Sequence, residues 1–194
     1  MPEMQFWEIF SLATGAVYIL LEILQNRWMW VVCILTSSAA AWVFFNQGLY
    51  ASMALNIYYV LMSFQGIWRW ARVSGKLKEQ ESTKSLHLVK PSPRILLISG
   101  VLTVAGTLGI MFVLRALSDP MPLLDAFVAV LSAIATWWLT RSFPEQWLVW
   151  IVADLANVIL CASQHLPWMI VLYAIYLISS VYGYFHWKKE GQYV

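Results

Sequence analysis

Long apolar stretches separated by short polar segments make up the sequence. A helix needs about 20 apolar residues to cross a hydrocarbon core of about 30 Å, and seven stretches are long enough. They are residues 6–24, 28–45, 50–70, 95–117, 123–140, 145–162 and 167–185. The pattern therefore predicts an all-α polytopic membrane protein with seven transmembrane helices.

The composition also favours a membrane protein over a soluble one. Of the 194 residues, 61% are hydrophobic and 11% are charged, whereas a soluble domain has about 45–50% apolar and about 25% charged residues. The net charge of +2 gives no sign of nucleic-acid binding. The sequence holds no metalloprotease, serine-hydrolase or phosphate-loop motif and no metal-ligand spacing. We therefore expect neither an enzyme nor a metal or cofactor site.

Lysine and arginine are unevenly distributed between the segments that connect the predicted helices. If the N-terminus lies outside, every lysine and arginine except Arg115 falls in a cytoplasmic segment. Cytoplasmic segments are the ones that carry an excess of basic residues. The charges therefore predict an N-out/C-in orientation, and we expect a multi-pass protein of the bacterial inner (plasma) membrane.

The two halves of the sequence resemble each other when one is shifted by 117 residues. The matched pairs include Trp30 with Trp147, Tyr59 with Tyr176, Gly66 with Gly183 and Trp70 with Trp187. We predict two copies of a three-helix unit, residues 1–72 and 118–194, which a cytoplasmic loop (73–94) and a linker helix (95–117) join in a 3+1+3 arrangement. An even number of crossings separates the copies, so the repeats are parallel, and transporters with such repeats bind substrate between the halves.

Polar and aromatic residues on the sixth predicted helix mark a candidate site. Trp147, Trp150, Asp154 and Asn157 follow one another at spacings of three or four, so they share one helix face. A carboxylate at membrane depth costs about 2.5–3.5 kcal/mol and by default indicates a functional site. The tryptophans offer flat surfaces to an aromatic ligand. The alternative is that Asp154 only pairs with a neighbouring helix.

Equivalent positions on the third and seventh predicted helices complete the candidate site. The candidates are Asn56, Tyr59, Ser63, Gln65 and Trp68 on the third helix and Tyr173 and Tyr176, followed by Ser180, on the seventh. The alternative for the amides is that Asn56 and Asn157 only form hydrogen bonds between helices. Six other tryptophans are interpreted as residues of the membrane interface, namely Trp7, Trp28, Trp137, Trp138, Trp168 and Trp187.

Four stretches carry a resemblance to a known family. They are residues 49–52, Gly66 with Trp70, residues 125–127 through 140–141, and residues 147–150. In these the chain resembles the PnuC-type vitamin-precursor transporters, whose best-known members carry nicotinamide riboside. The resemblance implies a 3+1+3 fold distantly related to the sugar-exporting SWEET proteins. It also implies facilitated diffusion, trapping of the substrate by a cytoplasmic kinase, and a homotrimer.

Two departures from the family pattern bear on the substrate. The third helix carries Asn56 where the family often has glutamine, and the sixth carries Asp154 where it often has asparagine. A carboxylate favours a cationic ligand, which nicotinamide riboside and thiamine both are, whereas riboflavin is neutral. We expect uptake of nicotinamide riboside, with thiamine as the alternative, then riboflavin. Outside the transporters, the alternatives are an intramembrane enzyme and a non-transporting membrane sensor or scaffold.

The expected roles follow from these side chains. Trp150 and Trp68 stack on the aromatic ring, and Asp154 balances its charge or orients a hydroxyl. Asn56, Asn157 and Tyr176 form hydrogen bonds with the polar substituents. No ion site is visible in the sequence, which favours transport without ion coupling.

Overall fold

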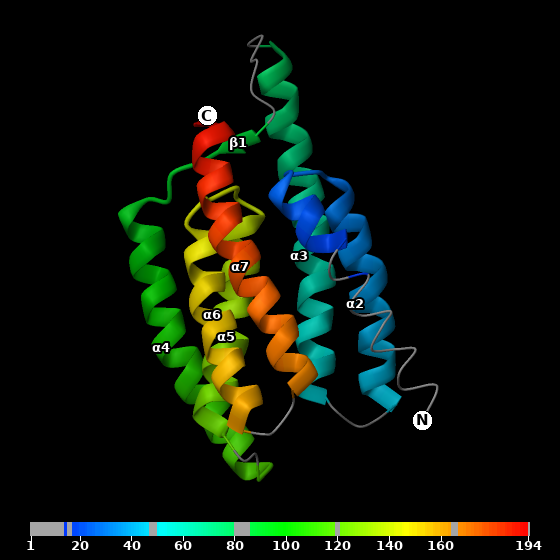
Figure 1. Cartoon of the computed structure of the whole chain (residues 1–194), viewed down its shortest axis with the longest axis vertical. Helices are drawn as coiled ribbons and strands as arrows, with labels where there is room; N and C mark the ends of the chain where they lie inside the picture. Colours follow the sequence, from blue (N-terminus) through cyan, green and yellow to red (C-terminus); the bar gives the residue numbers. More distant parts are fainter. Residues whose placement is uncertain are drawn as a thin grey trace. The chain divides into compact units, whose positions relative to one another are not determined.

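The computed structural model describes residues 14, 17–46, 50–79, 86–118, 121–163 and 167–193, and it divides into two compact units, Met1–Leu86 and His87–Val194. The first unit contains a helical segment (17–23), α2 (Trp28–Asn46) and α3 (Tyr50–Glu79). The second contains α4 (Pro93–Ala116), α5 (Pro122–Leu139), α6 (Gln146–Ser163) and α7 (Pro167–Glu190) (Figure 1). Two short strands, β1 (Leu86–Leu88) and β2 (Gly191–Tyr193), pair with each other.

The predicted helical, multi-pass character is confirmed. Among the described residues, α4, α5 and residues Ile170–Glu190 of α7 are long and apolar enough to cross a membrane. Shorter apolar stretches lie in α2 and α6. The first predicted helix, residues 6–24, falls mostly outside the described residues. The third stretch, predicted to cross the membrane over residues 50–70, lies within α3, and the helix continues to Glu79 into the segment that the sequence predicts as a loop or a short surface helix. Gly75 in this extension costs a helix only about 1 kcal/mol, and no proline stops it.

Each unit contains the same helix-ending turn, one repeat length apart. Gln25 (φ 50°) and Ser142 (φ 57°) both adopt the left-handed conformation. The next N–H bonds to the carbonyl five residues earlier, Asn26 to Leu21 at 2.8 Å and Phe143 to Trp138 at 3.2 Å. These bonds satisfy carbonyl groups at the end of a helix, as in a Schellman motif. The turn sets the angle at which the chain enters α2 in one unit and α6 in the other.

In the first unit, a tryptophan of α2 packs on a glycine of α3. A Cβ atom on Gly66 would lie 2.3 Å from Cε2 of Trp30, so only glycine leaves room for this indole. Trp70, one turn further along α3, meets the same ring edge to face, with centroids 5.3 Å apart. Trp30 is fully buried and Trp70 nearly so. These three residues hold α2 and α3 together.

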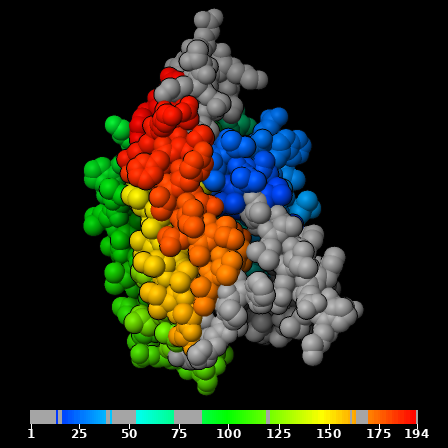
Figure 2. Space-filling model, in the orientation of Figure 1, coloured from blue at the N-terminus to red at the C-terminus, as the bar shows by residue number. Residues whose placement is uncertain are grey.

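The second unit repeats this contact between α6 and α7. A Cβ atom on Gly183 would lie 2.7 Å from Cε2 of Trp147. Trp147 and Trp187 meet edge to face, with centroids 5.5 Å apart and planes at 89°. Both indoles are fully buried. Figure 2 shows α6 in yellow and α7 in orange to red packed side by side. The residues matched by the sequence repeat therefore form the same packing motif in both units.

Two tryptophans assigned to the membrane interface are core residues instead, and that interpretation is wrong for them. Trp187 is fully buried in the contact with Trp147. Trp138 is 6% exposed, and its indole Nε1 donates a hydrogen bond to Ser99 on α4, at 3.0 Å. A buried indole usually finds a partner for its N–H, and here Trp138 thereby links α5 to α4.

A two-stranded sheet of β1 and β2, called the clasp below, joins the segment before α4 to the end of α7. Leu88 on β1 is fully buried, and the N–H of Val89 bonds to the carbonyl of Ser142 at 3.1 Å. The all-α prediction missed these strands. Each has three residues, and its partner lies about a hundred residues away in the sequence, so the local pattern carries no signal for them.

We predict that replacing Gly183 by alanine destabilises the protein. The new methyl group overlaps the Trp147 ring, and overpacking of this kind costs about 1–3 kcal/mol. The midpoint of thermal unfolding in detergent should fall by several degrees, since about 1 kcal/mol corresponds to roughly 2–4 °C at this size. Gly109→Ala is the matched control, because a Cβ atom there meets nothing within 4 Å. Equal midpoints for the two variants would contradict the packing role.

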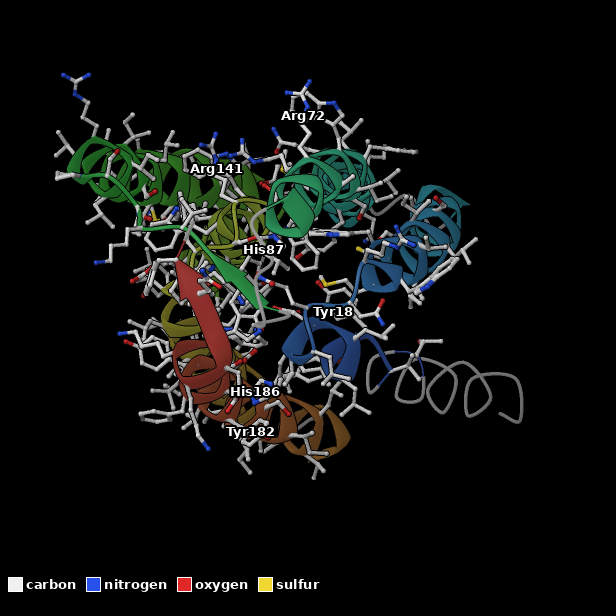
Figure 3. All side chains as sticks on the ribbon, turned by 90° about the horizontal axis from the view of Figure 1, so that it is seen from above. Tyr18, Arg72, His87, Arg141, Tyr182 and His186 are labelled. Atoms are coloured by element: carbon white, nitrogen blue, oxygen red, sulfur yellow. The ribbon has the colours of Figure 1, made fainter. Side chains whose placement is uncertain are left out.

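We also predict that acid weakens the protein through His87, which Figure 3 shows on β1. His87 is 4% exposed, and burial lowers its pKa from 6.5 to about 4. The unfolded chain therefore binds this proton more readily, and stability is lost as the pH falls from 6.5 towards 4. The loss should reach about 3 kcal/mol, since one pKa unit is about 1.4 kcal/mol.

Unfolding midpoints between pH 7 and pH 4.5 measure this effect. His87→Phe should flatten the profile over that range. His186→Phe serves as the control, since that ring lies partly exposed on α7. If the wild type and His87→Phe lose stability in parallel, His87 is not the source of the acid sensitivity.

Candidate functional site

The predicted site face of α6 points into the second unit. Trp147 is fully buried, Asp154 is 3% exposed and Asn157 is 8% exposed, while Trp150 is partly buried. The opposite face of α6 is apolar and exposed, and it consists of Leu148, Val152, Leu155 and Ile159. The helix therefore turns an apolar side outward, as a bilayer requires, and keeps the carboxylate inside.

Asp154 is joined to α7 by a buried hydrogen bond. The Ser180 hydroxyl, 1% exposed, donates to Oδ2 of Asp154 at 3.2 Å. This contact agrees with the interpretation that the carboxylate pairs with a neighbouring helix. A carboxylate offers about four acceptor positions, however, so one donor leaves capacity for a ligand.

An indole near the carboxylate keeps an unused donor. Nε1 of Trp150, one turn before Asp154 on the same face of α6, is buried and has no hydrogen-bond partner among the described residues. A buried donor without a partner costs about 1–3 kcal/mol. An acceptor group on a bound ligand would remove that cost.

The inner face of α7 carries the predicted tyrosines. Tyr173 and Tyr176 are half-buried, with ring centroids 6.2 Å apart and planes at 80°. Tyr173, Tyr176 and Ser180 follow one another at spacings of three and four residues, so they share one face of α7. Tyr182 lies on the opposite face, 59% exposed, and stacks on His186 (Figure 3). The face that the sequence selected is thus the less exposed face of α7, and its role in binding stays a prediction.

Trp147 is occupied by packing within the second unit. Its fully buried ring lies against Gly183 and Trp187. A ligand would reach this ring only if α6 and α7 moved apart. Its stacking role stays a prediction, and its packing role is visible.

In the first unit, α3 brings together only part of the predicted set. Asn56, Tyr59 and Ser63 share the inward face, where the Ser63 hydroxyl donates to the carbonyl of Tyr59 at 2.8 Å. Trp68 lies on another face of α3, 53% exposed, with the guanidinium of Arg72 3.8 Å from its ring centroid. This exposed face is apolar and also holds Ile57, Leu61 and Phe64. Gln65 is half-buried between the two faces.

The repeat shows how the two units differ in polar content. Ser63 and Ser180 are one repeat length apart, and both are buried. The position equivalent to Asp154 is Ser37, which is 6% exposed and lies 3.8 Å from the thiol of Cys33. The buried carboxylate at this level is therefore a property of the second unit.

Sequence reasoning missed a second buried carboxylate. Glu22 is 1% exposed and accepts a hydrogen bond from the Tyr18 hydroxyl. Glu22 lies near the end of the first predicted helix, beside Arg27, where the sequence favours interfacial solvation or an ion pair. Tyr18, one helical turn earlier, was the available signal. Among the described residues, no group of three or more histidine, cysteine or acidic side chains could hold a metal ion.

Comparison with known proteins relates the chain to membrane transporters. Residues 5–189 match a family described as nicotinamide mononucleotide transporter. A nicotinamide riboside transporter PnuC from Neisseria mucosa is 31% identical over 166 residues, which are 80% of this chain and 62% of that protein. One from Haemophilus influenzae is 32% identical over 89 residues, 46% of this chain and 38% of that protein. This chain therefore spans less than two thirds of the length of either relative.

A third relative and a solved structure agree with these matches. The nicotinamide riboside transporter PnuC of Escherichia coli is 26% identical over 170 residues, covering 77% of this chain and 71% of that protein. The crystal structure of the vitamin B3 transporter PnuC aligns with a TM-score of 0.66 at 25% identity. That alignment covers 92% of this chain and 79% of the other. The fold matches that of this transporter.

We predict that Ser180→Ala is more destabilising than Ser63→Ala. Removing Ser180 leaves a buried carboxylate without its hydrogen bond, which costs about 1.5–3 kcal/mol for a charged partner. Removing Ser63 deletes a bond within α3 and a contact with the Cys33 thiol of α2, and a thiol is a weaker partner than a carboxylate, so this loss should be smaller. Denaturation midpoints of the two purified variants measure the difference. Equal losses would mean that the bond to Asp154 adds nothing.

Proposed function

Because the chain belongs to the nicotinamide mononucleotide transporter family, we propose that it carries nicotinamide riboside across the membrane by facilitated diffusion. The names of its relatives support this substrate, and the family is one of transporters rather than enzymes. The apolar helices of a multi-pass membrane protein agree with it.

The observation that carries the proposal is the buried carboxylate of Asp154 beside the unused indole N–H of Trp150. Nicotinamide riboside has a pyridinium ring with a fixed positive charge and a ribose with several hydroxyl groups. A carboxylate attracts such a ring and strengthens its hydrogen bonds. An indole attracts the cation through its face. A ribose hydroxyl or the carboxamide oxygen of the same ligand can accept the Trp150 N–H, so one ligand satisfies both groups, which are otherwise costly to bury.

The remaining roles follow from the placement of each side chain. Asn157 and Tyr176 lie on the inward faces of α6 and α7, and we assign them hydrogen bonds to the ribose and the carboxamide. Tyr173 lines the same face of α7 as Tyr176.

In the first unit, we assign contacts with the substrate to Asn56, Tyr59 and Ser63 on the inward face of α3. For Gln65, Trp68 and Trp147, substrate contact stays a prediction of the sequence. Trp147 is fully buried by packing, Trp68 is exposed, and Gln65 is half-buried.

We propose the 3+1+3 arrangement with parallel repeats, residues 1–72 and 118–194, joined through the segment 73–94 and the linker helix 95–117. The repeated turn and the repeated tryptophan–glycine contact support it. The placement of lysine and arginine supports an N-out/C-in orientation in the inner membrane. A homotrimer, and trapping of the substrate by a cytoplasmic kinase, rest on the family resemblance.

Binding of a charged and a neutral form of the same ligand tests the proposal. Nicotinamide riboside carries the pyridinium charge, whereas its reduced form is neutral and has nearly the same shape. Asp154→Asn should weaken binding of the charged form about tenfold, which equals about 1.4 kcal/mol. Binding of the reduced form should change little. Tryptophan-fluorescence titration of the purified protein measures both.

Asp125→Asn is the matched control, since this carboxylate lies in the first turn of α5 and outside the proposed site. Thiamine and riboflavin are titrated in parallel, and uptake by proteoliposomes should stop once the inner and outer concentrations are equal. Two results overturn the proposal. One is tighter binding of thiamine than of nicotinamide riboside, and the other is an Asp154→Asn protein that binds both forms like the wild type.

A further inference from the structure

A hollow of about 570 Å³ opens where α4 ends and α5 begins. Its lining consists of Arg115 from the last turn of α4 and Met121, Pro122, Leu123, Leu124 and Phe127 from the start of α5. This volume lies in the range of small-molecule sites, about 300–1,000 Å³. Among the described residues of the lining, Arg115 is the charged one, and the others are apolar. The hollow lies within the second unit and is lined by none of the residues assigned to nicotinamide riboside.

The apolar walls are fixed by contacts with their surroundings. Sδ of Met121 accepts a hydrogen bond from the Ser163 hydroxyl at 2.8 Å, which ties the wall to the last turn of α6. The carbonyl of Met121 accepts the N–H groups of Leu124 and Asp125, at 3.0 and 3.1 Å. Pro122 begins α5 with a preset backbone angle. These contacts hold Met121 and Pro122, two residues of the lining, in place.

Arg115 is the exception in the charge distribution of the second unit. All other described lysines and arginines of this unit lie at the opposite end of its helices, and they are Lys90, Arg94, Arg141, Lys188 and Lys189. Arg115 is exposed, and among the described residues its guanidinium makes no ion pair or side-chain hydrogen bond. A single cation beside apolar walls, at the end of the unit that otherwise lacks basic residues, calls for an anionic partner.

We propose that this hollow binds one phospholipid molecule, with the phosphate on Arg115 and an acyl chain along the apolar walls. A guanidinium holds a phosphate through paired hydrogen bonds. Exposed apolar residues continue the walls on both helices, with Leu117 68% and Leu123 55% exposed.

The apolar lining distinguishes a lipid from a soluble anion. Free phosphate or a nucleotide would use Arg115 alone and leave the other five lining residues against water. A phospholipid uses both, since each buried methylene of its chain contributes about 0.8 kcal/mol. The occupant is therefore a molecule with a phosphate and a long hydrocarbon chain.

Native mass spectrometry of the delipidated protein tests this. Phosphatidylglycerol is the probe. Diacylglycerol has the same chains without the phosphate, and glycerol 3-phosphate has the phosphate without the chains. The wild type should retain one phosphatidylglycerol, with each fragment bound at least tenfold more weakly. Arg115→Gln should weaken the first binding step about tenfold, and Arg115→Lys should weaken it less.

Arg94→Gln is the matched control, because Arg94 is exposed at the opposite end of the same helix. It should bind phosphatidylglycerol like the wild type, and Arg115→Gln should bind nicotinamide riboside like the wild type. Unfolding midpoints show whether each variant is folded. If Arg115→Gln does not fold, lipid binding by Arg115→Lys provides the test. The proposal fails if an Arg115 variant keeps wild-type affinity for the lipid, or if glycerol 3-phosphate binds as tightly as the lipid.

Discussion

The contact between the Trp147 indole and Gly183 fixes how α6 and α7 lie against each other. Because a Cβ atom would lie 2.7 Å from the ring, the helices approach at this level only with glycine. Asp154 follows Trp147 by about two helical turns, and Ser180 precedes Gly183 by about one. Along the same pair of helices, the Ser180 hydroxyl lies 3.2 Å from the Asp154 carboxylate. The polar contact thus joins the same two helices as the apolar one.

The first unit is built on the same contact, between Trp30 and Gly66, and it ends the preceding helix with the same turn. The two units differ in the polar residues that they bury. Ser37 stands where the second unit has Asp154, so burial at this level costs much less. The two units thus carry their buried carboxylates at different positions, Glu22 in the first and Asp154 in the second. We assign recognition of a cationic ring to Asp154.

The bilayer explains the outward surfaces of the second unit. The exposed side chains of α6 are apolar, and most of the surface of α4 is exposed and apolar as well. A surface of this kind is stable only against hydrocarbon or another protein. The two ends of the unit differ, since one collects the basic residues and the clasp, and the other has a single arginine beside an apolar hollow. Contacts with lipid at that hollow would continue the apolar surface of α4.

The sequence by itself determined the helices, the repeat and the inward faces of α6 and α7. Hydropathy and helical spacing are local properties, and apolar helices form wherever backbone groups must bond within the segment. The sequence did not show that Trp147 and Trp187 are packed together in the interior, whereas Trp150 is partly buried and Trp68 is exposed. Aromatic residues at similar depths look alike until the element that covers each is known.

Only the tertiary structure decided which polar groups meet. Ser180 lies beside Asp154, and β1 pairs with β2, because the chain returns after many residues to pack there. The hollow beside Arg115 lies between the end of α4 and the start of α5, where Met121 is tied to α6. Such contacts depend on close packing between distant segments, where a missing Cβ atom or a single hydroxyl sets the geometry. A local pattern cannot encode them.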